Sequence, residues 1–277
     1  MTDPNGDGDS GLRELFRELR PVTDWGASTD PLPLDGRLLA FCCDETAFRS
    51  LLRTLEGEGD HPQVVAVLDT DITSILGTHG RKFELATRTQ ELVDEGSLRL
   101  GETQVSPRLP EVVGDTEAGI TLETGFDTTA VRSTLSPDLR RHLLQHVREA
   151  SLVSVYAPGR SELVARFTDE FGTDATDDLQ YALEEATTRT GQSVDPASVL
   201  ALIAARHDIP LRDLSLVAEE LNISSANTLS RRVNSDALDG VLDEGTFDTE
   251  FGRPPKRLQL VDEYADASLD DLLRFAV

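Results

Sequence analysis

Lysine, cysteine and long apolar runs are all scarce in this chain of 277 residues. Its two cysteines, Cys42 and Cys43, are adjacent, which excludes a disulfide framework and a cysteine-rich zinc site. No apolar run reaches the roughly 18 residues of a membrane span. Residues 1–10 lack the basic and apolar parts of a secretory signal. We therefore expect a cytoplasmic protein with no membrane partner.

Basic residues are also few, and they are almost all arginine. The chain has 51 acidic and 26 basic residues, a formal charge of −25, and Lys82 and Lys256 are its only lysines. This composition suggests a halophilic, archaeal protein. In molar salt, charges more than about 3 Å apart are largely screened. The net charge then reports solvation and does not exclude nucleic acid, so local basic segments become informative.

The first half of the chain alternates between strand and helix patterns. Residues 37–43 and 63–68 are continuous apolar runs typical of buried strands, and each precedes a helical pattern. Shorter strand candidates lie at residues 98–100, 111–113 and 119–122. The alternation predicts an α/β sandwich with a partly parallel sheet.

The second half is helical until residue 234. Helix patterns at 137–149, 161–171 and 176–190 precede three shorter ones at 196–207, 211–221 and 224–234, and two short strands at 246–251 and 257–261 follow. Three helices followed by a hairpin are typical of a winged helix-turn-helix. The predicted fold class is α/β, with an N-terminal α/β sandwich domain, a helical linker and a C-terminal winged helix-turn-helix.

These patterns divide the chain into five parts. The predicted parts are an N-terminal helix and loop at 1–35, an α/β sensing or dimerisation domain at 36–135, a helical linker at 136–190, a winged helix DNA-binding domain at 191–262 and an acidic C-terminal tail at 263–277.

The third of the short helices has the composition of a DNA-reading helix. Leu229 and Val233 are four residues apart and are expected to face inward. The outer positions are polar or basic: Ser225, Asn227, Thr228, Arg231, Arg232 and Asn234. Arginine can read guanine and asparagine can read adenine, while serine and threonine can hold phosphates.

Two segments depart from the general acidity of the chain. Residues 224–235 contain two bases and no acid, and residues 251–261 contain Arg253, Lys256 and Arg257 and no acid. Because acids outnumber bases about twofold overall, two such windows indicate a selected basic surface. We expect the helix to enter the major groove and these three wing residues to contact phosphate.

Both segments also resemble a known family. Residues 224–231, Ser-Ser-Ala-Asn-Thr-Leu-Ser-Arg, and 251–258, Phe-Gly-Arg-Pro-Pro-Lys-Arg-Leu, are similar to the DNA-binding domain of the haloarchaeal transcriptional regulator TbsP family. Residues 83–100 and 169–172 extend the similarity upstream. The resemblance implies that Ser230 and Arg231 lie on the recognition helix and Arg253 in the wing. It also implies regulation of metabolic genes and an N-terminal α/β sensing or dimerising domain.

The predicted function is therefore a sequence-specific DNA-binding transcriptional regulator and not an enzyme. We expect no cofactor and no metal. Double-stranded DNA and a second copy are the expected partners, since two half-sites multiply specificity. A small-molecule effector is a hypothesis from the architecture, with its site at the carboxyl ends of the strands near Asp44 and Asp69.

Two other functions stay open. The strand ending in Asp69-Thr-Asp71-Ile-Thr73 looks like the nucleophile motif of haloacid dehalogenase-type phosphatases, which use Mg²⁺. Lys82 and Asp115 are the available companions, but their spacing is too short for the intervening βαβ units. The simpler interpretation, which we favour, is an acidic turn that caps the helix beginning at Ile72. A winged helix used for protein contacts is the other alternative.

Two smaller motifs have structural explanations. Cys42 and Cys43 end a strand, but the acids that follow do not favour a reactive thiol. His142 and His146 are four residues apart on a helix and lack a third metal ligand at a useful spacing.

Overall fold

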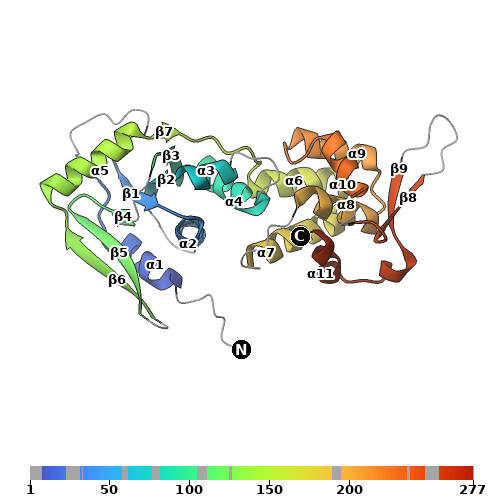
Figure 1. Cartoon of the computed structure of the whole chain (residues 1–277), viewed down its shortest axis with the longest axis horizontal. Helices are drawn as coiled ribbons and strands as arrows, with labels where there is room; N and C mark the ends of the chain where they lie inside the picture. Colours follow the sequence, from blue (N-terminus) through green and yellow to red (C-terminus); the bar gives the residue numbers. More distant parts are fainter. Residues whose placement is uncertain are drawn as a thin grey trace. The chain divides into compact units, whose positions relative to one another are not determined.

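The fold comes from a computed structural model, and residues 8–22, 32, 34–57, 62–76, 82–104, 111–124, 127–188, 195–235, 238–246 and 256–276 are described. The chain forms two compact units (Figure 1). Unit 1 comprises residues 1–77 and 92–155, and unit 2 comprises residues 78–91 and 156–277. Within the described ranges, every helix is too short or too polar to cross a membrane.

Unit 1 is built on a mixed sheet whose strand order is β6-β5-β4-β1-β2-β3-β7. The strands are β1 (Arg37–Cys42), β2 (Gln63–Leu68), β3 (Leu98–Glu102), β4 (Val112–Val113), β5 (Glu117–Thr124), β6 (Asp127–Thr134) and β7 (Ser151–Leu152). Strands β1, β2 and β3 are parallel, and the others join antiparallel. The partly parallel sheet predicted from the sequence is thus confirmed.

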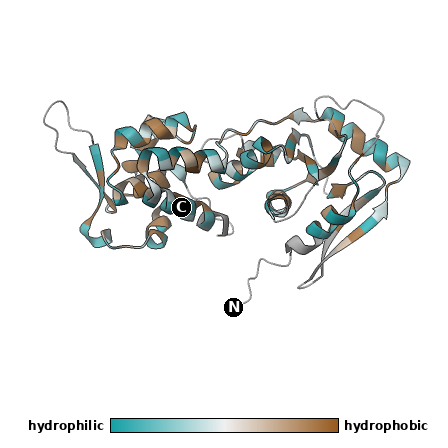
Figure 2. Cartoon of the chain, turned by 180° about the vertical axis from the view of Figure 1, so that it is seen from behind, coloured by the Kyte–Doolittle hydropathy of each residue, from teal (hydrophilic) through white to brown (hydrophobic). Residues whose placement is uncertain are grey.

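Helices cover both faces of this sheet. Unit 1 contains α1 (Gly8–Glu18), α2 (Glu45–Glu56), α3 (Thr70–Leu76) and α5 (Pro137–Glu149). Leu143 and Val147 of α5 pack with Phe41 on one face. Gly119 faces α1 on the other, since a Cβ atom there would lie 2.3 Å from Leu15. The central strands, buried on both faces, are brown in Figure 2.

Local signals explain where these helices begin. Asp44 caps α2 by accepting a hydrogen bond of 2.8 Å from the Ala47 N–H. Ser136 caps α5 in the same way, and Pro137 follows at the first helical position.

Unit 2 is mainly helical. It contains α6 (Arg160–Phe171), α7 (Thr173–Thr188), α8 (Pro196–Arg206), α9 (Leu211–Glu220), α10 (Ala226–Val233), the hairpin β8 (Leu242–Thr246) and β9 (Lys256–Leu260), and the final turns η1 (Asp262–Tyr264), α11 (Leu269–Leu272) and η2 (Leu273–Ala276). Helix α4 (Phe83–Asp94) begins in this unit, and its last three residues belong to unit 1. Phe83 of α4 is part of the core of unit 2.

The structure groups two segments differently from the sequence-based division. The expected linker at 136–190 is split, because α5 packs on the sheet of unit 1 while α6 and α7 belong to unit 2. The end of the expected acidic tail is integrated into unit 2, since Leu272 and Leu273 are buried in its core. Ala276 O also accepts a hydrogen bond of 2.6 Å from Asp195 N. Apolar residues at helical spacing explain this packing.

Candidate nucleic-acid interface

Unit 2 contains the helix order of a winged helix. Helices α8, α9 and α10 follow one another and precede the antiparallel hairpin β8–β9. Pro210, between α8 and α9, forms an additional bridge to Arg257 of β9, which attaches the hairpin to the helices. In a winged domain, the segment between the first two helices commonly adds such a bridge to the hairpin, and Pro210 takes this place here.

Helix α10 presents one apolar and one polar face. Leu229 and Val233 are buried, as predicted from their spacing. Ser225 caps the helix, and its Oγ accepts a hydrogen bond of 3.1 Å from the Thr228 N–H. The exposed positions are Ser225, Asn227, Thr228, Ser230, Arg231, Arg232 and Asn234. All the helix residues predicted to contact DNA are therefore solvent-accessible.

The two arginines of α10 have different surroundings. Arg232 Nη2 lies 3.3 Å from Asp195 Oδ1, and Asp195 also accepts a hydrogen bond of 2.8 Å from Ser198 N at the start of α8. Arg231 is exposed, and within the described residues no acid lies within ion-pair distance of it. Arg231 is thus the arginine of α10 that is directly available to a ligand.

The bases of the wing are paired within unit 2. Lys256 Nζ lies 2.7 Å from Glu244 Oε2, on the neighbouring strand. Arg257 forms an ion pair with Asp208, which follows α8. Exposed ion pairs contribute only about 0–1 kcal/mol each, so they can be exchanged for a phosphate. Arg253 lies outside the described residues.

The structure adds two residues that sequence reasoning did not select. Glu219 of α9 accepts a hydrogen bond of 2.8 Å from Ala226 N, so a carboxylate occupies the first turn of α10. Arg212 is exposed near the start of α9, with no ion pair in the described part of the chain. Arg212 is followed directly by Asp213, so it does not lie in an acid-free basic segment of the sequence. The hydrogen bond from Ala226 N to Glu219 joins α9 to α10, and no sequence motif indicates it.

The phosphatase-like motif has a structural role. Asp69 Oδ1 accepts a hydrogen bond of 3.2 Å from Asp71 N at the start of α3, as a helix cap does. Asp115 N donates to Arg20 O at 2.9 Å. Lys82 belongs to unit 2, whereas Asp69, Asp71 and Asp115 belong to unit 1. These contacts support the capping interpretation of the motif.

Neither the cysteines nor the histidines form a recognisable reactive site. Burial raises the pKa of the Cys42 thiol above its usual range, and burial with nearby Asp44 raises the pKa of Cys43. Both shifts disfavour a thiolate. His142 and His146 have ring centroids 4.7 Å apart. In the described ranges, no group of three metal-ligating side chains is found.

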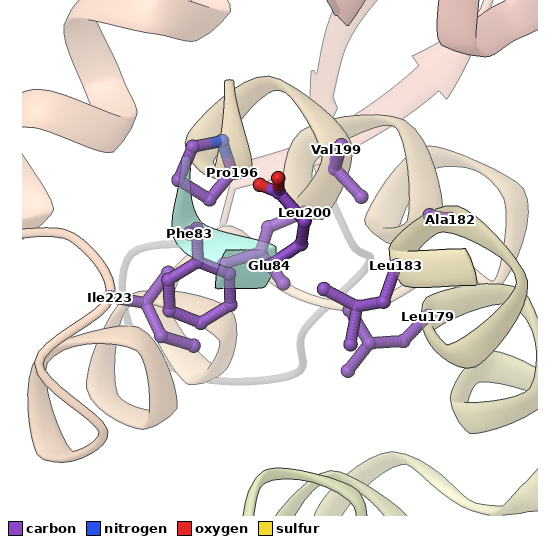
Figure 3. Close-up of a pocket in the computed structure, with 9 residues that line it drawn as sticks. All are labelled: Phe83, Glu84, Leu179, Ala182, Leu183, Pro196, Val199, Leu200 and Ile223. Carbon is purple, nitrogen blue, oxygen red and sulfur yellow. The ribbon is translucent and has the colours of Figure 1, made fainter. Parts of the chain in front are cut away.

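A small apolar pocket lies in unit 2, close to the start of α10. It is lined by Phe83, Glu84, Leu179, Ala182, Leu183, Pro196, Val199, Leu200 and Ile223. Figure 3 shows that Glu84 is the one charged side chain drawn there, with its carboxylate near Pro196. The cavity volume is about 20 Å³, enough for one water molecule. The pocket is therefore a packing void in the present arrangement.

The comparisons with known proteins agree with this geometry. Residues 159–277 match the family described as transcriptional regulator TbsP-like, C-terminal HTH domain. The resemblance seen in the sequence is thereby confirmed over this part of the chain. No curated protein and no solved structure matches.

Proposed function

We propose that the protein binds specific DNA sequences to regulate metabolic genes, starting from the match of residues 159–277 to the TbsP-like C-terminal HTH domain family of transcriptional regulators. The observation that carries the proposal is the exposed polar face of α10, which ends in Arg231 and Arg232 and is followed by the wing. The family and the absence of a recognisable catalytic group in the described residues both favour a regulator over an enzyme.

DNA recognition divides between the helix and the wing. Helix α10 enters the major groove, where Asn227 and Thr228 of its first turn and Arg231 of its last turn reach base edges. Arg253, Lys256 and Arg257 contact phosphates beside the groove. Ser225 and Ser230 hold the backbone at the margins of the helix, and Arg232 reaches phosphate by exchanging its pair with Asp195.

The acidic composition supports a cytoplasm of very high salt, as in haloarchaea. Weak phosphate contacts are lost in such salt, because log K falls with a slope near −0.9 per neutralised phosphate. Specific affinity then depends on base contacts, shape and released water. A homodimer doubles the number of bases read, and unit 1 supplies the dimerising or sensing function.

An effector would bind at the edge of the sheet where β1, β2 and β3 end. Asp69 directly follows β2, and Glu102 is the last residue of β3. Thr73 Oγ1 donates a hydrogen bond to Glu102, so polar groups are already gathered at this edge. Ligands of open α/β sheets bind at such edges.

The test is chromatin immunoprecipitation of the tagged protein in its native salt, beside an Arg231→Ala, Arg253→Ala double variant. We expect sharp promoter peaks that disappear in the variant while its abundance and fold are unchanged. Peaks that persist in the variant would refute the assignment of helix and wing. An abundant, folded protein with no enrichment would leave a winged helix used for protein contacts.

A further inference from the structure

Strand β6 forms a long open edge of the sheet in unit 1. It spans eight residues, Asp127–Thr134, and pairs along its whole length with β5. It is the last strand in the sheet order, and Figure 1 shows it at the margin of the sheet. Among the described residues, no strand pairs with its outer side. The opposite margin ends in β7, which has only two residues.

The register identifies which backbone groups point outward. Leu135 N donates to Thr116 O at 2.8 Å, directly beyond the paired ends Thr134 and Glu117. In an antiparallel pair, hydrogen-bonded positions alternate. Odd positions of β6 therefore bond to β5, and positions 128, 130, 132 and 134 direct their N–H and C=O groups to the open edge.

The usual protections of an edge strand are missing from β6. Native edges are commonly protected by proline, by charged side chains, lysine above all, or by a bulge. Residues 127–134 contain neither proline nor lysine, and their charged residues are Asp127 at the first position and Arg132, which pairs with Glu18. The register with β5 is also continuous over all eight residues, without a bulge. An unprotected edge of this length is a template for another strand.

An apolar pair lies beside this edge on the α5 side of the sheet. Ile120 and Val131 are directly opposite each other and are 36% and 41% exposed. Arg132, the next residue, belongs to the other face, where it pairs with Glu18 of α1 at 2.8 Å. A strand added to β6 at this position would therefore meet an exposed valine, while Arg132 is held on the opposite face by Glu18.

We propose that a second copy of this chain binds here, with the two β6 strands pairing antiparallel about a two-fold axis at Val131. The outward positions then pair 130 with 132 and 128 with 134 of the other copy, and the two Val131 side chains meet at the axis. The sheet becomes continuous across the dimer. This surface specifies the homodimer of the proposed function, but it does not depend on DNA binding.

Charge favours a second copy at this surface over others. The chain carries a net charge of −25, so most contacts between copies bring acids together. Residues 128–136 contain no acid and a single base, Arg132, and the one acid of the strand, Asp127, is at its first position, away from the proposed axis. In the proposed register Arg132 lies opposite Ala130, so like charges are not opposed.

The first test is the mass of the full chain without DNA, measured by light scattering after gel filtration at high micromolar concentration in molar salt. The wild type is expected at twice the chain mass of 30.2 kDa. Ala130→Pro removes an outward N–H and leaves the bonds to β5 intact, so it should give monomers. Val131→Lys should do the same.

The matched control is Leu152→Lys, which places a lysine at an exposed position of β7 on the opposite margin. It should remain dimeric. A monomeric wild type would overturn the proposal, as would dimers that survive both β6 substitutions with an unchanged circular dichroism spectrum.

A second measurement covers the case in which a β6 variant fails to fold. In a Cys43→Ser background, Val131→Cys should form a disulfide between copies, because non-hydrogen-bonded antiparallel pairs have Cα atoms about 4.5 Å apart. Ser133→Cys should not, since position 133 faces position 129. Equal cross-linking of the two variants would contradict the register. Loss of DNA binding in an intact dimer would count only against the regulatory function.

Discussion

Arg232 Nη2 of α10 lies 3.3 Å from Asp195 Oδ1, the carboxylate that also caps α8. The pair joins the end of α10 to the beginning of α8. Its neighbour Arg231 has no such tie in the described residues. Two adjacent arginines of one helix thus have different surroundings, and we propose that Arg232 orients the helix while Arg231 contacts DNA.

The first prediction separates these tasks. Arg231→Ala should weaken binding to the specific operator by about 1–3 kcal/mol and relax the base preference, because a bidentate base contact is lost. Its melting temperature should not change. Arg232→Ala should lower the free energy of unfolding by less than about 1 kcal/mol and change operator affinity less. Fluorescence anisotropy with operator and scrambled DNA measures both effects, and a larger operator loss for Arg232→Ala would contradict the assignment.

The second prediction concerns the ion pair within the wing. Glu244→Gln releases Lys256 from its partner and should tighten binding to all DNA sequences at a given salt concentration. The plot of log K against log salt should steepen by about one phosphate, a slope change near −0.9. Asp243→Asn is the matched control, because it removes the same charge from an adjacent exposed residue that has no ion pair in the described part of the chain. An equal change in both variants would mean that net charge alone is responsible.

The third prediction is a pH dependence that originates at His146. Burial and the neighbouring His142 lower the pKa of His146 from its ordinary value of 6.5, while Glu149 acts in the opposite direction. The unfolded chain therefore takes up a proton at a higher pH than the folded one. Stability falls as the pH drops from about 6.5 through the lower pKa of the folded state.

His146→Gln removes this proton uptake. Relative to wild type, its free energy of unfolding should increase, so that the variant becomes relatively more stable, when the pH is lowered from 8 to 5. Urea titrations at the two pH values measure the difference, with His142→Gln as a comparison at an exposed position. A difference that is the same at both pH values would exclude His146 as the source.

The fourth prediction concerns the void in unit 2. Val199→Ile adds one methyl group to a residue that lines a cavity of about 20 Å³. Filling it should raise the free energy of unfolding by about 0.5–1 kcal/mol. Val217→Ile makes the same change at a buried position that does not line the cavity, where overpacking costs about 1–3 kcal/mol. Opposite signs in denaturant titrations are the expected result.

Much of the fold could be predicted, because apolar periodicity and caps were strong. Helices α8, α9 and α10 were predicted within a few residues, and Asp195 and Ser225 cap α8 and α10. Strand β6 was missed. Its only apolar residues are Ala130 and Val131, so it lacks the alternation that marks a half-buried strand.

The wing was harder to place than the helices. Strand β8 was expected at 246–251, but it spans Leu242–Thr246, and residues 247–251 lie outside the described ranges. Its sequence, Leu-Asp-Glu-Gly-Thr, has low strand propensity. Pairing with β9, whose Leu258 is fully buried, compensates for it.

The candidate site was predictable in its residue types and not in its contacts. The acid-free segments identified α10 and β9, since composition is local. The partners of Arg232, Lys256 and Arg257 are 37, 12 and 49 positions away along the chain. Only the tertiary fold brings such residues together.

The core of unit 2 draws on two separated stretches of the chain. Phe83 of α4 is buried with Leu179, Leu200 and Ile223, although the family match begins only at residue 159. A fragment that starts at the boundary of that match would leave these side chains uncovered. The fragment 159–277, expressed alone, should therefore aggregate. Adding residues 78–91 as a separate peptide should restore its solubility.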